Sequence, residues 1–223
     1  SNIGWSRHDG RITSDHDAGG SGFRPRAYMN ILEADGEKLL AAVRDLLAAK
    51  GIASNAEIAE RIASTDAANP GQGARMVAKA WIDPTYRTLM LEDGGTAAEQ
   101  LGIPMRGAPP LGVLENTADL HHLVVCTLCS CYPRAVLGYP PFWFKSAAYR
   151  ARGVRDPRGL IAEWGTVLPD GMKIRVVDST ADYRWMVLPL RPAGTEGWPE
   201  ERLASIVREG DMIGVTVPAL PAK

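Results

Sequence analysis

Three cysteines lie within six residues of this 223-residue chain, and the sequence contains no other cysteine. They are Cys126, Cys129 and Cys131. An odd number of thiols at this spacing does not form a disulfide framework, and it indicates metal binding or redox chemistry in a reducing compartment. The segment is therefore expected to fold into one tight turn that gathers the three sulfurs.

The charge balance argues against several classes of partner. The chain has 25 basic and 26 acidic residues and no sustained Lys/Arg block, so we expect neither a nucleic acid nor an anionic membrane as partner. No stretch approaches the roughly 18 apolar residues that span a bilayer, and residues 1–30 lack the apolar run of a signal peptide. We expect a cytoplasmic globular protein.

The first hundred residues are expected to be mainly helical. Residues 1–30 are polar and Gly-rich, and we interpret them as a flexible arm. Apolar residues recur at helical spacing over residues 35–50, and Gly51 follows in the position that ends a helix. Further helices are predicted at residues 55–64 and 71–81 and after the capping pair Asp83-Pro84.

After Pro110 the pattern changes to β-branched runs. Strands are predicted at residues 112–115 and 123–125, so the cysteines follow directly on a strand end. Later segments predict helices near residues 142–152, 156–164 and 199–207 and strands at 173–178 and 183–188. The chain is therefore expected to be α+β, with a flexible arm (1–30), a helical arm (31–105) and an α+β catalytic domain (106–223).

Three thiolates fit a soft metal better than the other uses of cysteine. A structural zinc site needs a fourth side chain, whereas the nearest histidine, His122, lies four residues before Cys126; a CxxC redox pair does not need a third cysteine. Alternatively, the backbone nitrogens of Ser130 and Cys131 complete the site. Three sulfurs and two nitrogens fill five octahedral positions, and the sixth is left for water or substrate, as Lewis-acid catalysis requires.

The segment VCTLCSCYP at residues 125–133 closely resembles the metal-claw signature of nitrile hydratase α subunits. The resemblance covers roughly residues 35–215, and the segments that carry it occur in the same order along the chain as in the family. The further segments that carry it are GARMVAKAW (73–81) with Asp83-Pro84, VLG (136–138), PP (140–141), WFK (143–145), DPRG (156–159), DST (178–180) and RPAGTEGW (191–198).

The resemblance implies a layered α-β-β-α metal-claw domain that binds a non-corrin Co(III), with Fe(III) as the less favoured ion. It implies that Cys126 ligates as a thiolate, Cys129 as a sulfinate and Cys131 as a sulfenate, with main-chain nitrogens of Ser130 and Cys131 completing the set. The Ser130 side chain is expected beside the open position. Thr127 and Tyr132 resemble the cobalt type of the family.

The implied reaction is hydration of a nitrile to its amide, in which hydroxide or the Cys131 sulfenate oxygen attacks the nitrile carbon. The resemblance further implies a β-type partner subunit, whose arginines contact the oxidised sulfurs, and an activator or metallochaperone. This chain alone is expected to be incomplete.

Arg134 departs from the family pattern, because simple nitrile hydratases usually carry a substrate-lining Trp there. A guanidinium favours an anionic or polar substrate. The γ subunit of thiocyanate hydrolase, a relative with the same cobalt claw, is therefore an alternative, as is a nitrile hydratase for a larger polar nitrile. In a third interpretation Arg134 only forms a salt bridge at a subunit interface.

Several other residues have more than one interpretation. Tyr132 is placed with Arg134 in the substrate pocket, and Asp182 is placed behind the metal ligands, although it equally suits a solvated turn. His121 and His122 face opposite sides of a strand, so they are expected to pack rather than ligate together. Arg150 stabilises either the claw or a partner interface, or it is simply a solvated residue on a helix surface. A structural or metal-delivery subunit without turnover is the alternative from another functional class.

Overall fold

The computed structural model describes residues 6–8, 11–13 and 25–220, and the side chains of residues 35–63 and 65–220. The chain forms two compact units, Ser1–Ile58 and Ala59–Lys223, which we describe separately. No helix in the described part of the chain is both long and apolar enough to cross a membrane.

The first unit contains a short antiparallel strand pair, β1 (Ser6–His8) and β2 (Arg11–Thr13), and the helix α1 (Pro25–Ala49). Of the predicted flexible arm (1–30), residues 25–30 are instead the first part of α1, and residues 1–5, 9–10 and 14–24 lie outside the described residues. The helix predicted from residue 35 begins earlier because residues 26–34 are also good helix formers. It ends as predicted: Gly51 has φ 63°, and the Ile52 N–H donates to the Leu47 carbonyl at 3.0 Å.

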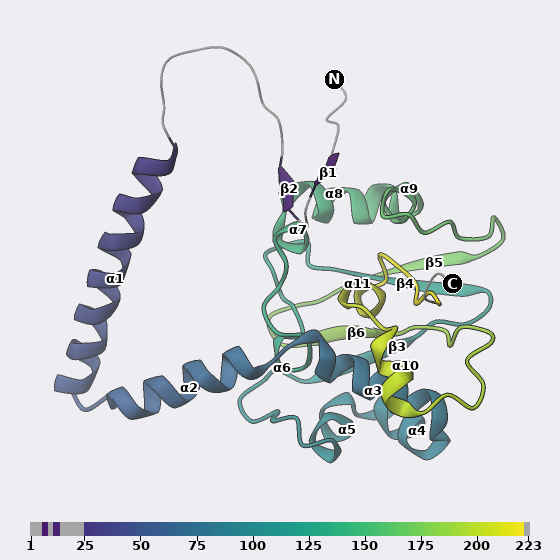
Figure 1. Cartoon of the computed structure of the whole chain (residues 1–223), viewed down its shortest axis with the longest axis horizontal. Helices are drawn as coiled ribbons and strands as arrows, with labels where there is room; N and C mark the ends of the chain where they lie inside the picture. Colours follow the sequence, from purple (N-terminus) through teal and green to yellow (C-terminus); the bar gives the residue numbers. More distant parts are fainter. Residues whose placement is uncertain (1–5, 9–10, 14–24, 221–223) are drawn as a thin grey trace, which may run out of the picture. The chain divides into compact units, whose positions relative to one another are not determined.

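Helices form the outer layers of the second unit (Figure 1). The helix predicted from residue 55 is α2, which crosses the boundary between the units, and the helix predicted from residue 71 is α3. Three helices, α3, α4 and α9, each begin with a proline that follows an Asn or Asp cap. The helices are α2 (Asn55–Ala67), α3 (Pro70–Ile82), α4 (Pro84–Glu92), α5 (Gly94–Gln100), α6 (Arg134–Leu137), α7 (Phe142–Lys145), α8 (Ala147–Arg155), α9 (Pro157–Glu163), α10 (Glu200–Ser205) and α11 (Glu209–Ile213).

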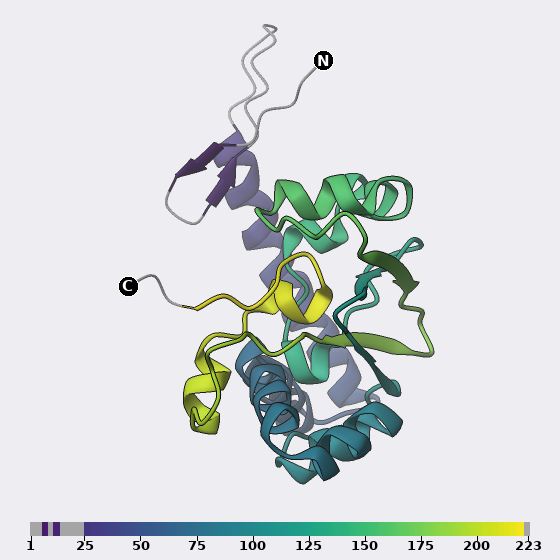
Figure 2. The same cartoon turned by 90° about the vertical axis from the view of Figure 1, so that its right-hand side faces the viewer.

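Two parallel strand pairs form the centre of the second unit. The strand β3 (Leu111–Glu115) pairs with β6 (Arg184–Leu188), and β4 (Leu120–Val125) pairs with β5 (Lys173–Asp178). Helices α8 and α9 cover the β4–β5 pair, and α4 and α5 pack on β3 from the opposite side (Figures 1 and 2). These layers confirm the predicted α+β, α-β-β-α arrangement.

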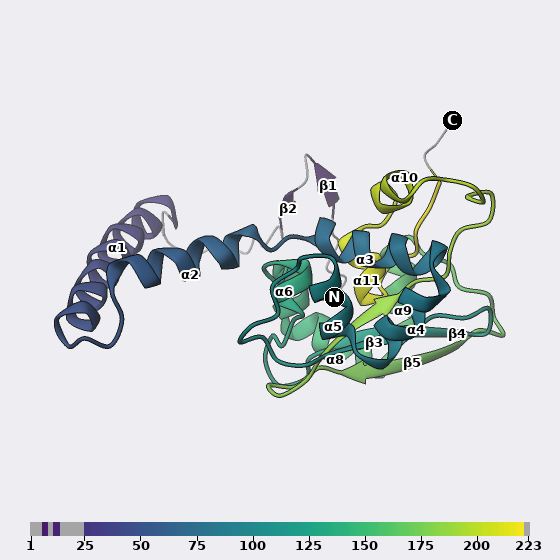
Figure 3. The same ribbon diagram turned by 90° about the horizontal axis from the view of Figure 1, so that it is seen from below.

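The buried interior explains why β4 is so apolar. Leu123, Val124 and Val125 are fully buried between the helical layer and the second strand pair, as expected for a parallel strand covered on both faces. Figure 3 shows α10 beside α3, on the helical side of the unit. The predicted division at residues 30 and 105 stays a prediction; in the structure α4 and α5 pack directly on β3.

Two details differ from the sequence prediction. The single helix expected near residues 142–152 is divided into α7 and α8, because the Ser146 side chain caps α8 by accepting the Tyr149 N–H at 3.1 Å. The helices α5, α6 and α11 were not predicted, since each is too short to show a helical repeat.

Candidate metal centre

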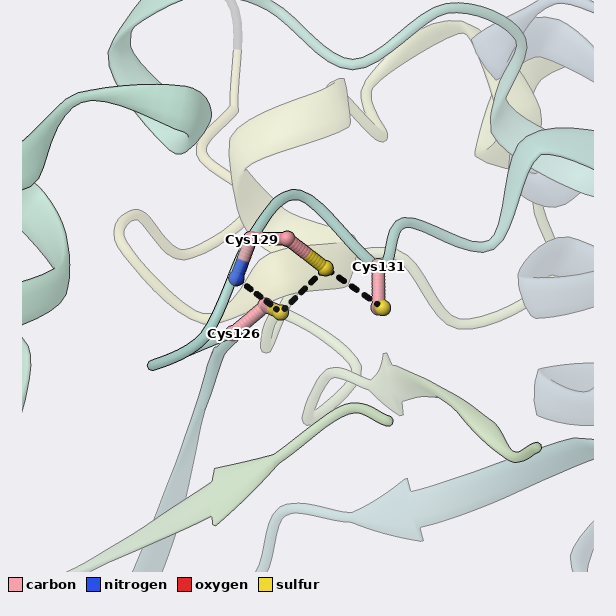
Figure 4. A group of neighbouring side chains, drawn as sticks. All are labelled: Cys126, Cys129 and Cys131. Carbon is pink, nitrogen blue, oxygen red and sulfur yellow. Dashed lines mark hydrogen bonds between the residues drawn. The ribbon is translucent and has the colours of Figure 1, made fainter. Parts of the chain in front are cut away.

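The three cysteines lie on one turn directly after the buried strand β4 (Figure 4). The Cys129 Sγ atom lies 3.6 Å from that of Cys126 and 3.1 Å from that of Cys131. The Cys129 N–H donates to the Cys126 sulfur at 3.3 Å, which tightens the turn. All three sulfurs lie within 4.8 Å of one another, and no disulfide joins them. The turn predicted from the spacing is present.

This donor set fits a single metal ion. With metal–sulfur bonds of about 2.3 Å, two sulfurs at right angles lie about 3.3 Å apart and two at a tetrahedral angle about 3.8 Å apart. The two sulfur–sulfur distances, 3.6 and 3.1 Å, fall close to these values. The backbone N–H groups of Ser130 and Cys131 also face the Cys129 sulfur, and neither donates a backbone hydrogen bond within the described structure. These amides are therefore available to a ligand.

Burial differs sharply across the cluster. Cys126 is 1% and Cys131 is 7% exposed, whereas Cys129 is exposed. Hydrogen bonding from Cys131, and then from Cys126, lowers the pKa of the Cys129 thiol. Burial raises the pKa of the Cys131 thiol to about 12. Cys129 is therefore the more easily ionised of these two thiols, and metal binding must release a proton from Cys131.

Two side chains from different elements hold the claw segment, residues 126–131. Because β4 and β5 are parallel, their carboxyl ends meet, and the Asp178 carboxylate accepts both the Thr127 N–H, at 2.9 Å, and the Thr127 hydroxyl. From α8, the Arg150 guanidinium donates to the carbonyls of Thr127 (3.3 Å) and Leu128 (3.1 Å). Arg150 thus contacts the claw segment, which agrees with the first of its three predicted roles.

The predicted histidine pair packs in the interior. His121 and His122 are both buried, and burial lowers the pKa of each. The His121 Nε2–H donates to the Gly214 carbonyl at 2.8 Å, while Asn116 contacts the other ring nitrogen at 3.1 Å. Gly214 has φ 89°, and a Cβ atom there would lie 1.9 Å from the His122 carbonyl oxygen. Neither histidine belongs to the metal cluster of the described residues.

The other predicted site residues lie in three different places. The Ser130 side chain is half-buried on the claw segment, and Tyr132 is buried with its hydroxyl donating to Glu209 at 2.5 Å. Arg134 is exposed and stacks over the Tyr139 ring, 4.6 Å from its centroid. Asp182 is exposed in the bend between β5 and β6.

A cavity of about 570 Å³ joins the two predicted pocket residues, because both Tyr132 and Arg134 line it. Three more arginines line the same cavity: Arg61, Arg106 and Arg184. Arg184 also lowers the pKa of Cys131 through its charge, so this guanidinium acts on both the cavity and the cluster.

Comparison with known proteins identifies the family of the chain that carries this turn. The profile described as "Nitrile hydratase, alpha chain" matches residues 34–216, which include both strand pairs and the three cysteines. The chain belongs to the nitrile hydratase α-chain family. The low-molecular-weight cobalt-containing nitrile hydratase subunit alpha of Rhodococcus rhodochrous is 50% identical over 154 residues, 69% of this chain and 74% of that protein.

Two further relatives differ in reaction or metal. The thiocyanate hydrolase subunit gamma of Thiobacillus thioparus is 44% identical over 196 residues, 83% of this chain and 81% of the relative. The solved structure of a double mutant of the Fe-type nitrile hydratase from Comamonas testosteroni superposes with a TM-score of 0.76 at 40% identity. That match covers 85% of this chain and 96% of the other. Nitrile hydratase relatives of this chain therefore include cobalt and iron enzymes.

The sequence interpretation missed three residues that support the site: Asp178, Arg184 and Glu209. Asp178 ends a strand that is parallel to the strand before the cysteines, so a correct strand pairing would have revealed it. Arg184 begins β6 and Glu209 begins the short helix α11; neither has a local sequence signal that relates it to residues 126–132.

Proposed function

We propose that this chain is the metal-binding α-type subunit of a nitrile hydratase, which hydrates a nitrile to the corresponding amide at a non-corrin Co(III) centre. The observation that carries the proposal is the gathering of three sulfurs within 4.8 Å on one turn, in a chain that belongs to this family. Relatives named as cobalt-containing favour cobalt over iron.

The metal would be held by Cys126, Cys129 and Cys131 and by the backbone nitrogens of Ser130 and Cys131. When bound, such an ion supplies Lewis acidity that polarises a nitrile or activates water. Exposure of Cys129, whose pKa is lowered, favours its oxidation to a sulfinate, and we propose a sulfenate at Cys131. Cys131 and Ser130 are then the catalytic residues of this chain.

The protein provides a fixed frame for these donors. Asp178 and Arg150 bind the claw segment at Thr127 and Leu128, which keeps the cysteines in one arrangement before a substrate arrives. Tyr132 and Arg134 line the cavity beside the cluster, and we assign them to the substrate pocket. Asp182 stays a prediction as a residue that acts through the metal ligands.

We further propose that a β-type subunit completes the enzyme and that an activator loads the metal. The relatives are named as single subunits, alpha or gamma. On α1, the apolar side chains of Leu39, Val43 and Leu46 are 66%, 44% and 55% exposed, which is unusual for helical apolar residues at this spacing. Three free thiols favour the cytoplasm, where cysteines stay reduced.

The second candidate is a thiocyanate hydrolase subunit of the γ type. Identity to that relative extends over 83% of this chain, and Arg134 suits an anion. A structural metal subunit without turnover is the third candidate, and it would hold zinc between unmodified thiols.

One experiment separates the three. The chain is expressed in cobalt medium with its neighbouring partner genes, and the complex is analysed for metal, intact mass, and turnover of nitriles and of thiocyanate. We expect near-stoichiometric cobalt, about three added oxygen atoms and amide formation. Faster thiocyanate turnover would favour the second candidate, and zinc with unmodified thiols would refute both catalytic ones.

A further inference from the structure

The cavity beside the claw segment has an unusual lining. Its volume is about 570 Å³, within the range typical of small-molecule sites. Four arginines line it: Arg61 from α2, Arg106 from the loop before β3, Arg134 from α6 and Arg184 from β6. No Asp or Glu is among its described lining residues. The cavity is therefore strongly cationic.

None of these four arginines forms an ion pair with a described carboxylate, although Glu209 contacts the lining residue Tyr132 and Asp66 contacts Tyr139 beside Arg134. Arg134 stacks on Tyr139, a contact that keeps its charge. By contrast, Arg87 and Arg152, elsewhere on the surface, each pair with a carboxylate. The cavity thus holds charge that an anionic ligand can bind.

Two buried polar atoms of the lining lack a partner. They are the Nη1 atom of Arg184 and the Oε1 atom of Gln72, and both residues line the cavity. Buried polar groups in folded proteins are almost always hydrogen-bonded, so an unpaired guanidinium nitrogen marks a place where a ligand or ordered solvent belongs. A guanidinium binds a carboxylate through two parallel hydrogen bonds, which matches this donor.

We propose that this cavity binds the anionic end of a nitrile substrate, a compact oxyanion such as a carboxylate, while the nitrile group reaches the cysteine cluster. The inference rests on the proposed function. The cavity reaches the residue next to the cluster, because Tyr132, which follows Cys131 in the chain, is among its lining residues; none of the three cysteines is. A three-atom anion would leave most of the 570 Å³ to water, so the volume favours a larger organic acid.

The test compares 4-cyanobenzoate with benzonitrile, which lacks the carboxylate group. Their binding to the partner-containing complex is measured by equilibrium dialysis at low ionic strength. We expect 4-cyanobenzoate to bind at least about tenfold more tightly, as a charge-assisted contact would give, and this preference to shrink as salt is added. Equal affinities would overturn the proposal, and so would thiocyanate binding as tightly as 4-cyanobenzoate.

Substitutions of the cavity arginines test where the anion binds. Replacing Arg61 and Arg106 together by Gln should reduce the preference for 4-cyanobenzoate to about threefold or less, with an unchanged melting temperature as evidence of an intact fold. The matched control is Arg155→Gln, on the exposed end of α8 and outside the cavity lining, which should keep the full preference. A preference that survives in the double variant would refute the assignment.

The outcomes also separate this inference from the proposed function. Tight binding of 4-cyanobenzoate by a cobalt-loaded complex that hydrates no nitrile would keep the cavity assignment and remove the catalytic one. Hydration of benzonitrile without tighter binding of 4-cyanobenzoate would do the reverse.

Discussion

The hydrogen bond between Tyr132 and Glu209 makes the stability of the site depend on pH. Tyr132 is 1% exposed, and its hydroxyl donates to the half-buried Glu209 carboxylate at 2.5 Å. Burial raises the pKa of Glu209, and the Tyr132 hydrogen bond partly opposes that rise. The substitution Tyr132→Phe removes the hydroxyl and leaves the carboxylate without this donor.

The expected loss follows from the type of bond. Hydrogen bonds to charged groups contribute about 1.5–3 kcal/mol, and half-burial of Glu209 places this one near the lower end, at about 1.5 kcal/mol. For a domain of this size the melting temperature should fall by roughly 3–6 °C. Tyr139→Phe is the matched control: Tyr139 is exposed, its hydroxyl contacts Asp66 at 3.0 Å, and its loss should cost about 0.5 kcal/mol or less.

The sign of the pH dependence follows from the raised pKa. Folding raises the pKa of this carboxyl, so the ionised carboxylate lowers the free energy of unfolding at pH values above the pKa of an unfolded glutamate, about 4.3. This destabilisation disappears at low pH, where the carboxyl is protonated. Tyr132→Phe raises the Glu209 pKa further, so the variant should lose more free energy of unfolding at about pH 7.5 than at about pH 5. Urea unfolding followed by tryptophan fluorescence measures both. Equal losses at the two pH values would refute the reasoning.

Three further substitutions follow from the contacts of the claw and of β4. Asp178→Ala removes both contacts to Thr127, and cobalt affinity should fall about tenfold or more, as for other residues that orient metal ligands. Metal analysis of the purified complex tests this loss, and Asp170→Ala, at an exposed residue, is the control. Gly214→Ala places a Cβ 1.9 Å from a backbone carbonyl and should cost at least about 3 kcal/mol in thermal unfolding. Gly51→Ala, with φ 63° and open space, should cost about 1 kcal/mol, and a similar loss for both would contradict the steric argument. Cys129→Ser should abolish the visible absorption of the cobalt-loaded complex, and an unchanged spectrum would exclude Cys129 as a ligand.

Local sequence patterns predicted the parts of the fold that have local causes. The cap and proline pairs before α4 and α9, the terminal Gly51 and the strand before the cysteines were all visible in the sequence. The division at Ser146 was missed because a serine inside a helical pattern caps a new helix only when the chain turns there, which its neighbours do not specify.

The candidate site was predictable only where its residues are adjacent in sequence. The three cysteines, Ser130 and the turn itself follow from spacing. Asp178 lies 51 residues after its partner Thr127, and Glu209 lies 77 residues after Tyr132, so only the strand pairing and the packing of α11 bring them together. The same applies to the cavity, whose arginines come from four separate segments of the chain.

The contact between His121 and Gly214 also constrains how the protein is made. These two residues are 93 positions apart, and β5, the partner strand of β4, follows the cysteines by some forty residues. A ribosome therefore releases Cys126, Cys129 and Cys131 well before the segments that hold their strand in place. Because contacts with those later segments hold the turn, the three thiols are not yet held in the folded turn when they leave the ribosome. A metal ion that needs the folded turn can therefore bind only after the C-terminal residues have closed over β4.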